Sequence, residues 1–460
     1  MDLGGEGAAR SRSPSTASFL SFLWPGLGQW YLRRTRAALL YALPVLVVVV
    51  VAAVRAISSI ESLALDMIDP SVALTVLVLI VLLAGWRLSS MVDAVGGVRG
   101  FRGPGAAPHA VLFAALALIV VLTHAAAGYY AWSFYDAGSH IFVADGTPGA
   151  TPGPAASVDD FQATPLATPA TKASRINILL TGIDSSEQRA HALTDTLIVV
   201  SIDPVTNKVA MLSFPRDIAR FPMWNGKTFP GKINSLMTYA NQHPAEYPDG
   251  GLPTLIRETG FLLGVPIHYY AAVNLDGFEQ MIDQVGGVTI VNDRAIDDPG
   301  YGGWHDGRIG FTLSAGPHKL DGQTALAYVR SRKGAGDNDF TRARRQQQLL
   351  VALRKKLTEP AMIGKLPGLL QAAGRTIKTN FPPDRLSEML DLGRGTADDN
   401  IAKYVLGPPY ATHPPNDTTG GTYILKIDFD RLAALSVKLF GQDSAYAKSA
   451  ASGPTPSAAP

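Results

Sequence analysis

The strongest constraint on the fold is a series of long apolar stretches in the first third of the chain. Three of them are candidates to cross a membrane, at residues 37–54, 72–86 and 110–132. The first two are short against the roughly 20 residues that a spanning helix needs, so we expect flanking residues to complete them. The sequence therefore predicts an all-α membrane region over residues 37–132, because backbone groups inside a bilayer must be hydrogen-bonded internally.

Loop charges predict how this region is oriented. The segment before the first stretch and the loop after the second are rich in arginine, at Arg10, Arg12, Arg33, Arg34, Arg36, Arg87, Arg99 and Arg102. The loop between the first two stretches is acidic, with Glu61, Asp66 and Asp69. Cytoplasmic loops carry the excess of Lys and Arg. We therefore expect a multi-pass protein of the cell membrane, with residues 1–36 cytoplasmic or interfacial and the chain after Trp132 outside.

A further apolar segment, residues 19–31, precedes the first stretch. It contains Pro25 and two glycines, which would break a spanning helix. We interpret it as a re-entrant or interfacial element that places Trp30 and Tyr31 at the lipid headgroups. A fourth span is the alternative, and it would reverse the predicted topology.

Composition divides the remainder of the chain. Residues 133–174 are rich in Thr, Pro, Ala and Gly, and residues 443–460 have the same character, so we expect an extended linker and a disordered tail. Residues 175–442 resemble an ordinary soluble domain. Cysteine is absent, which excludes disulfides, Cys-ligated zinc and a thiol nucleophile. The net charge of +2, without a clustered basic face, argues against nucleic acid as a partner.

Strand and helix patterns alternate in the soluble domain. We predict strands at 176–183, 197–202, 209–214 and 325–329, and helices at 278–285 and 341–357. Residues 203–207 read as the turn of a hairpin. This mixture predicts an α/β fold with a central sheet.

Arginines and aspartates gather where these elements end. They are Asp184, Asp195, Arg216, Arg330, Arg332, Asp339, Arg342 and Arg345. On a strand, Arg330 and Arg332 would point to the same face. On a helix, Arg342 and Gln346 would share a face, with Arg345 adjacent. Guanidinium groups suit phosphate oxygens, so the residues alone predict an anion-binding site, with surface ion pairs as the alternative.

The motifs that carry these residues resemble the LytR-CpsA-Psr family. The matching segments are, in chain order, 175–184, 194–196, 213–217, 232–234, 285–288, 320–332 and 339–347. Each motif is weak alone, but together and in this order they are specific. The resemblance implies a three-layer α/β/α domain with a central mixed sheet and an apolar tunnel for a lipid. Family members usually have a single N-terminal span, so the three stretches of this chain are a departure.

Site residues follow from the same resemblance. It implies that Asp184 and Asp195 hold Mg²⁺, and it assigns the pyrophosphate to Arg216, Arg330, Arg332, Arg342, Arg345 and Gln346. Asp339 falls on a further motif carboxylate and is a candidate general base. The alternative for Asp339 is an ion pair that orients Arg332 or Arg342.

The function that the resemblance implies is glycopolymer transfer from a polyprenyl-pyrophosphate carrier to peptidoglycan, during assembly of the cell wall. Teichoic acids, capsules and arabinogalactan are the polymers handled by members of the family. A sugar hydroxyl of peptidoglycan would attack the phosphorus that bears the glycan, and polyprenyl phosphate would leave. Two alternatives are a hydrolase acting on the same lipid pyrophosphate and a non-catalytic lipid-binding regulator of envelope synthesis.

Overall fold

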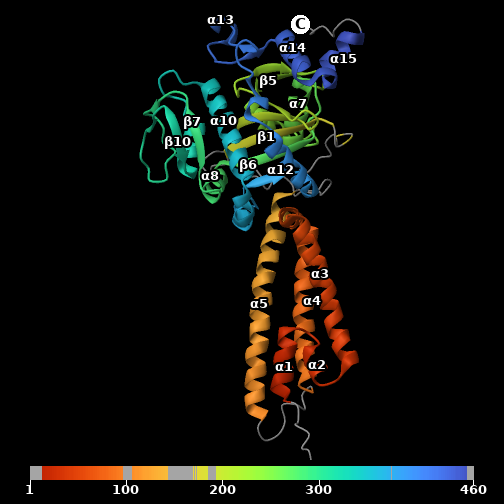
Figure 1. The fold of residues 1–460 in the computed structure, drawn as a ribbon. Helices are drawn as coiled ribbons and strands as arrows, with labels where there is room; N and C mark the ends of the chain where they lie inside the picture. The colour runs from red at the N-terminus through yellow and green to blue at the C-terminus, as the bar shows by residue number, and fades with distance from the viewer. Residues whose placement is uncertain are drawn as a thin grey trace, which may run out of the picture. The chain divides into compact units, whose positions relative to one another are not determined.

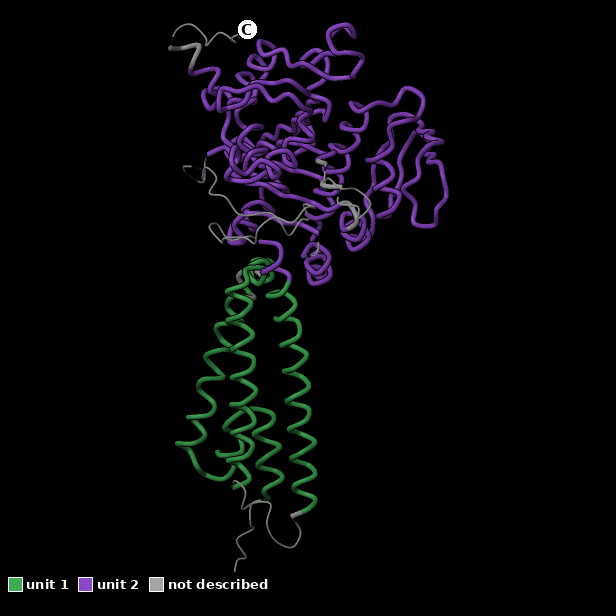
Figure 2. The backbone as a smooth tube through the Cα atoms, turned by 180° about the vertical axis from the view of Figure 1, so that it is seen from behind, with its two compact units in different colours: residues 1–136 green, residues 137–460 purple. Residues whose placement is uncertain are grey.

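The computed structural model describes residues 13–96, 106–142, 169, 171, 174–184, 193–374 and 376–452. The chain forms two compact units, the first ending at Asp136 and the second beginning at Ala137 (Figure 2). Each unit has its own packing, and the two are described separately.

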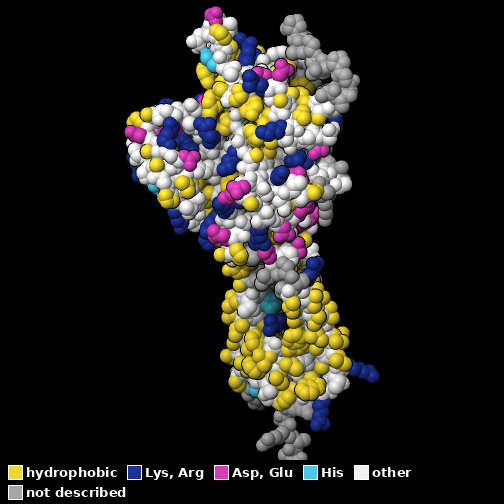
Figure 3. Space-filling view, turned by 45° about the horizontal axis from the view of Figure 1, so that its top comes forward, with side chains coloured by type: hydrophobic (Ala, Val, Ile, Leu, Met, Phe, Trp, Pro, Cys, Tyr) yellow, Lys and Arg dark blue, Asp and Glu magenta, His cyan; other side chains and the backbone are white. Residues whose placement is uncertain are grey.

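The first unit is helical (Figure 1). Its helices are α1 (Pro14–Leu23), α2 (Leu27–Tyr31), α3 (Thr35–Asp66), α4 (Pro70–Ala94) and α5 (Ala106–Ile141), of which α5 continues into the second unit. Within α3, α4 and α5, the segments Thr35–Arg55, Pro70–Ala94 and Ala107–Ile141 are long and apolar enough to cross a membrane. Figure 3 shows apolar side chains covering the surface of these helices, as lipid-facing helices require.

The segment before the first span folds as the short helices α1 and α2, which pack against α4. A Cβ on Gly28 would lie 2.1 Å from the carbonyl oxygen of Ala17, so only glycine permits this approach. Gln29 is fully buried, and its amide donates to the backbone oxygen of Ser90 at 2.7 Å and to Asp93 Oδ2 at 3.1 Å. The helix is interrupted at Pro25, as predicted, and hydrogen bonds from Gln29 hold the segment against α4.

Two predicted boundaries are wrong. Helix α5 continues to Ile141, so residues 133–141 of the predicted linker are helical. The predicted tail is ordered as far as Ser452, through the 3₁₀ turn Gly441–Asp443 and helix α15 (Ala445–Ser452). Buried contacts that composition does not reveal hold this end, because the Tyr446 hydroxyl donates to the oxygen of Leu262 at 2.9 Å. The rest of the tail and nearly all the rest of the linker lie outside the described residues.

A six-stranded mixed sheet forms the centre of the second unit, in the order β11-β6-β1-β2-β3-β12. Its strands are β1 (Ile176–Asp184), β2 (Leu193–Asp203), β3 (Lys208–Ser213), β6 (Tyr269–Asn274), β11 (Ile377–Thr379) and β12 (Ile401–Val405). Strand β2 pairs antiparallel with β1 and β3, whereas β1–β6 and β3–β12 are parallel. The predicted hairpin joins β2 to β3, with Asn207 at a φ of 52°.

Helices cover both faces of the sheet. One face packs through Leu179, Val199 and Leu212 into a large core shared with α6 (Leu236–Gln242), α7 (Gly251–Leu263) and α14 (Phe429–Phe440). The other face packs through Ile198 and Met211 against α10 (Asp339–Leu357), and near its far edge against α12 (Leu386–Gly395). This is the predicted three-layer α/β/α arrangement. The apolar lipid tunnel stays a prediction.

A smaller cluster lies beside the sheet, built on α8 (Leu275–Gln284) and α9 (Gly322–Arg330). Its strands are β7 (Val288–Asn292), β8 (Ile296–Asp298), β9 (Phe311–Leu313) and β10 (Gly316–Leu320). The remaining elements are β4 (Ala219–Pro222), β5 (Thr228–Lys232), α11 (Leu366–Gly374), α13 (Asn416–Thr419), β13 (Ala411–Thr412), β14 (Lys426–Ile427) and the 3₁₀ turns Ile233–Ser235, Pro360–Lys365, Pro383–Arg385 and Asp398–Asn400.

The predicted strand at 325–329 is wrong, because these residues lie in helix α9. Asp321 caps that helix by accepting from the backbone N–H of Thr324. A short apolar run cannot be assigned to strand or buried helix from periodicity alone. The same-face argument for Arg330 and Arg332 fails with it, since Arg330 ends the helix and Arg332 lies in the following loop.

Candidate active site

A β-bulge presents Asp195. Strands β1 and β2 pair Gly182 with Thr196 and then Ile183 with Thr194, so Asp195 is the extra residue between them. Bulges redirect a side chain and are frequent beside active sites. The carboxylate of Asp195 is 27% exposed and accepts a hydrogen bond from Arg216 Nη1 at 3.3 Å. Asp184 ends β1 on the neighbouring strand, and its side chain lies outside the described residues.

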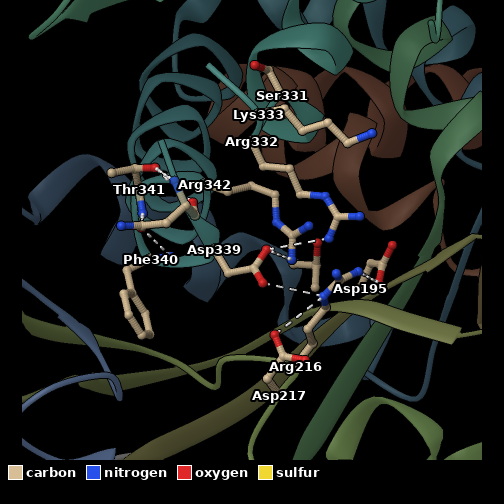
Figure 4. A network of polar contacts seen from close by, with 12 residues as sticks. Asp195, Arg216, Asp217, Ser331, Arg332, Lys333, Asp339, Phe340, Thr341 and Arg342 are labelled. Carbon is tan, nitrogen blue, oxygen red and sulfur yellow. Dashed lines mark hydrogen bonds and ion pairs between the residues drawn. The ribbon is translucent and has the colours of Figure 1, made fainter. Parts of the chain in front are cut away.

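Asp339 gathers three guanidinium groups at the first turn of α10 (Figure 4). Its Oδ1 lies 3.2 Å from Arg342 Nη2 and 3.7 Å from Arg332 Nη1. Its Oδ2 lies 3.5 Å from Arg216 Nε. The arginines come from three elements: the segment after β3, the loop after α9, and α10 itself. We call Arg216, Arg332 and Arg342 the arginine cluster.

The electrostatics of the cluster favour a bound anion. Burial lowers the pKa of Arg342, which is 7% exposed, and nearby Asp339 only partly offsets this. Burial also lowers the pKa of Arg216, but Asp339, Asp195 and Asp217 outweigh burial, and the net pKa is raised. Burial raises the pKa of Asp217, which pairs with Lys232. Desolvated guanidinium groups interact strongly with phosphate oxygens that reach them.

A cavity of about 320 Å³ opens beside the cluster, and we call it the front cavity. Its lining includes Asp195, Arg330, Arg332, Arg342 and Gln346. The structure thus brings together most of the residues predicted to hold the pyrophosphate and one of the predicted metal ligands. Arg216 lies beside this cavity, through its contact with Asp195.

Arg345 departs from the prediction. It pairs with Asp337 Oδ2 at 3.3 Å, and its guanidinium lies 5.6 Å from the ring centroid of Tyr328. It lines a separate cavity of about 730 Å³, which we call the rear cavity, and it does not line the front cavity. Side chains three residues apart on a helix differ by about 60° in direction. That angle lets Asp337 hold Arg345 away from the front cavity.

Asp298 is a residue that the sequence did not reveal. It is 1% exposed, and its Oδ2 accepts from Ser331 Oγ at 2.8 Å and from the backbone N–H groups of Arg332 and Lys333 at 3.1 Å each. This carboxylate fixes the loop that carries Arg332. Its motif, Asp-Asp-Pro-Gly, indicates only a turn.

A third cavity, of about 360 Å³, is lined by Asp339 itself, and we call it the side cavity. It is lined by Arg216, Asp217, Arg332, Lys333, Asn338, Asp339, Phe340, Tyr423 and Leu425. Arg332 and Lys333 line both the front and the side cavities. No pattern in the sequence indicated Tyr423, which lies in a Thr- and Gly-rich loop.

The carboxylates present fit the chemistry of Mg²⁺, which binds through one or two carboxylates together with substrate phosphates and water. Asp184 is the last residue of β1, and Asp195 lies near the start of the neighbouring strand β2. Asp195 also lines the front cavity. Among the described side chains, no group of three or more His, Asp or Glu could hold a metal ion. Mg²⁺ stays a prediction.

An α/β/α domain that collects arginines and carboxylates around an anion-sized cavity defines a class of proteins that handle phosphoryl groups. The LytR_cpsA_psr family matches residues 154–440, more than half of the chain, and the protein belongs to this family.

Curated relatives resemble about half of the chain. The chain is 33% identical over 221 residues to "Polyisoprenyl-teichoic acid--peptidoglycan teichoic acid transferase TagU" of Halalkalibacterium halodurans, covering 48% of this chain and 66% of the relative. It is 29% identical over 262 residues to "Biofilm regulatory protein A" of Streptococcus mutans, covering 56% of this chain and 61% of the relative. The match spans less than two thirds of the length of either relative.

Solved structures also resemble part of the chain. The crystal structure of B. subtilis TagV is 26% identical, with a TM-score of 0.47, covering 58% of this chain and 97% of that one. The structure "TagT bound to LIIa-WTA" is 24% identical, with a TM-score of 0.44, covering 59% of this chain and 90% of that one.

Proposed function

We propose that the protein is a membrane-anchored enzyme that transfers a glycopolymer from a polyprenyl-pyrophosphate carrier to peptidoglycan. The observation that most directly supports this proposal is the arginine cluster around Asp339, beside a cavity that Asp195 also lines. Family membership and relatives named as teichoic acid transferases support the proposal. A teichoic acid or a similar polymer is the proposed cargo.

The pyrophosphate occupies the front cavity in this proposal. Arg330, Arg332 and Arg342 hold its oxygens, and they stabilise the charge that grows on the leaving phosphate. A sugar hydroxyl forms a new bond to the phosphorus that bears the glycan. The bridging P–O bond breaks, polyprenyl phosphate leaves with the bonding pair, and the hydroxyl proton is released. Bound Mg²⁺, held by Asp184 and Asp195, would add positive charge to the phosphate oxygens.

Asp339 is assigned to orienting the arginines. All three guanidinium groups of the arginine cluster contact its carboxylate as ion pairs, and these contacts hold the guanidinium groups in place. Because these ion pairs already restrict the three arginine side chains, less side-chain entropy is lost when a substrate binds. The ion-pair alternative for Asp339 thus fits the geometry better than a role as general base.

A reconstituted assay tests the function. The full chain in detergent is given a polyprenyl-pyrophosphate-linked glycan, a peptidoglycan oligosaccharide and Mg²⁺, and the products are separated by mass. Wall-linked product that is lost in Asp195→Ala and on chelation would support the transferase and its metal. Release of free glycan would support a hydrolase, and lipid binding without turnover would support a regulator.

Topology needs its own test. We propose that the first unit crosses the membrane with its N-terminus in the cytoplasm, as the arginine-rich ends indicate. A reporter fused after residue 174 should be active only outside the cytoplasm. Activity of that fusion inside the cell would exclude the proposed reaction, because peptidoglycan lies on the other side.

A further inference from the structure

The side cavity combines two kinds of wall. One wall is charged and belongs to the arginine cluster and its carboxylates, Asp217 and Asp339. The other is apolar and aromatic, with Phe340, Tyr423 and Leu425. We propose that the side cavity is a saccharide subsite in which Tyr423 packs against the apolar face of a pyranose ring. The proposal rests on the proposed function and names where that reaction binds a sugar.

Tyr423 is exposed and yet held in place. The residue is 47% exposed, which is high for an aromatic residue. The ring packs on His413, with centroids 4.7 Å apart and planes at 32°. His413 is fixed in turn, because its ring nitrogens lie 2.8 Å from the oxygen of Ile424 and 2.9 Å from Asn416 Oδ1. A ring fixed before binding loses little entropy when a ligand packs on it.

The loop of Tyr423 is joined to the segment of Arg216. The backbone N–H of Leu425 donates to the oxygen of Asp217 at 2.8 Å, and that of Ala219 donates to the oxygen of Leu425 at 2.9 Å. Tyr423 therefore stands at a fixed position relative to the arginine cluster. Burial raises the pKa of the Tyr423 hydroxyl, and nearby Asp217 and Asp339 raise it further, in keeping with its place beside the carboxylates.

The lining of the side cavity fits a sugar, because it combines aromatic, apolar and hydrogen-bonding side chains. A pyranose has an apolar C–H face that packs on aromatic rings, and a rim of hydroxyls that donate to carboxylates. Asp217 and Asp339 can accept such hydrogen bonds, and Arg216, Arg332 and Lys333 can donate hydrogen bonds to sugar oxygens. The volume of about 360 Å³ lies within the range of small-ligand sites.

The position of the side cavity gives the subsite its role. Because Arg332 and Lys333 line both cavities, a sugar in the side cavity has its hydroxyls next to a pyrophosphate in the front cavity. Two sugars of the reaction meet this description: the acceptor sugar of peptidoglycan and the first sugar of the donor. Both have the same chemistry, and kinetics distinguish them.

The experiment compares Tyr423→Ala, Tyr423→Phe and Phe261→Ala in the full chain. Phe261 is a matched control, since it is 45% exposed on α7 and does not line the side cavity. We expect Tyr423→Ala to raise the KM for one sugar substrate about tenfold, with kcat changed less than threefold. Tyr423→Phe should keep the wild-type KM, because the ring face is retained. Phe261→Ala should behave as wild type.

The KM values of Tyr423→Ala for the two sugar substrates identify which sugar binds in the side cavity. A higher KM for the peptidoglycan oligosaccharide alone assigns the subsite to the acceptor, and a higher KM for the lipid-linked donor alone assigns it to the donor. Wild-type KM values for both substrates in Tyr423→Ala would overturn the proposal.

A binding readout separates this proposal from the function. If wild-type protein shows no transfer, saturation-transfer NMR with an oligosaccharide of N-acetylglucosamine and N-acetylmuramic acid still tests the subsite. Signal transfer that is present in wild type and lost in Tyr423→Ala would support it, and equal signals in both would overturn it.

Discussion

Asp337 and Asp339, two residues apart at the start of α10, each gather arginines in a different way. The Asp339 side chain is 20% exposed and contacts three guanidinium groups at 3.2, 3.5 and 3.7 Å. The Asp337 side chain is 4% exposed and contacts Arg294 at 2.6 Å and Arg345 at 3.3 Å. The first group borders the front and side cavities, whereas the second borders the rear cavity and surrounds a more deeply buried carboxylate.

The difference shows that burial of an arginine does not reveal its role. Arg342 and Arg345 are both 7% exposed. Arg345 is shared between Asp337 and the backbone oxygen of Ser331, so it supports the loop from behind. The carboxylate that pairs with Arg342 is shared with two other arginines, and Arg342 lines the front cavity, where a ligand can reach it. We expect one to serve chemistry and the other to serve stability.

The largest effect is expected at Arg342. Arg342→Met should lower transfer by about 10²–10³, since a desolvated donor to a transition-state anion is worth about 3–4 kcal/mol. The free energy of unfolding should change by less than about 1 kcal/mol, because the cluster loses one of several like charges. Initial rates and urea unfolding of the full chain check both. Arg342→Lys should recover only part of the rate, and a wild-type rate in both variants would remove Arg342 from the site.

Arg345 should show the reverse pattern. Arg345→Met should lower the free energy of unfolding by about 3 kcal/mol, because the buried Asp337 loses a partner. Transfer by the folded protein should fall less than about tenfold, through loosening of the loop that carries Arg332. Denaturation and kinetics on the same preparation measure this. Unchanged stability with abolished transfer would return Arg345 to the pyrophosphate site.

Glu258 on α7 extends the comparison to a carboxyl group without an arginine. It is fully buried, and burial raises its pKa to about 8, opposed only in part by the backbone N–H of Trp224. Between its unfolded pKa of 4.5 and 8, the folded chain binds more protons than the unfolded chain, so stability falls as pH rises. Unfolding at pH 6 and 7 should differ by up to about 1.4 kcal/mol through this group. Glu258→Gln should abolish that part of the difference.

The smallest effect is expected at Arg344. It is exposed and lines the rear cavity, which at about 730 Å³ is larger than either the front or the side cavity. Arg344→Ala should change transfer less than about twofold and the free energy of unfolding by less than about 0.5 kcal/mol. A large rise in the KM for the donor would show that substrate reaches behind the loop, and the division between the two arginine groups would then be wrong.

Local patterns predicted much of the fold. The spacing of apolar residues predicted the strands at 176–183 and 209–214 and the helix at 341–357, because that spacing reflects which side chains are buried in the folded chain. The run at 325–329 failed, because five apolar residues fit a buried strand and a buried helix equally. Its helix is decided by the cap at Asp321, which lies outside the run.

The site residues also divide into those that local motifs predict and those that they do not. Arg332, Arg342 and Gln346 could be predicted because they lie in motifs. Asp298 and Tyr423 could not be predicted, because their places depend on contacts between distant parts of the chain. Asp298 accepts from Arg332, 34 positions further along. The loop of Tyr423 is held by hydrogen bonds between Leu425 and the backbone of Asp217 and Ala219. Arg345 lies at the rear cavity because it pairs with Asp337, which precedes the helix and which helical spacing alone does not reveal.

The buried amide of Gln29 bears on how the first unit is made. Its hydrogen-bond partner, the backbone oxygen of Ser90, lies 61 residues further along the chain. At about 5–20 residues per second, a ribosome needs about 3–12 s to supply that partner after Gln29 has been synthesised. During this interval the amide has to remain in contact with water or headgroups. The N-terminal helices are therefore synthesised before the helix against which they dock.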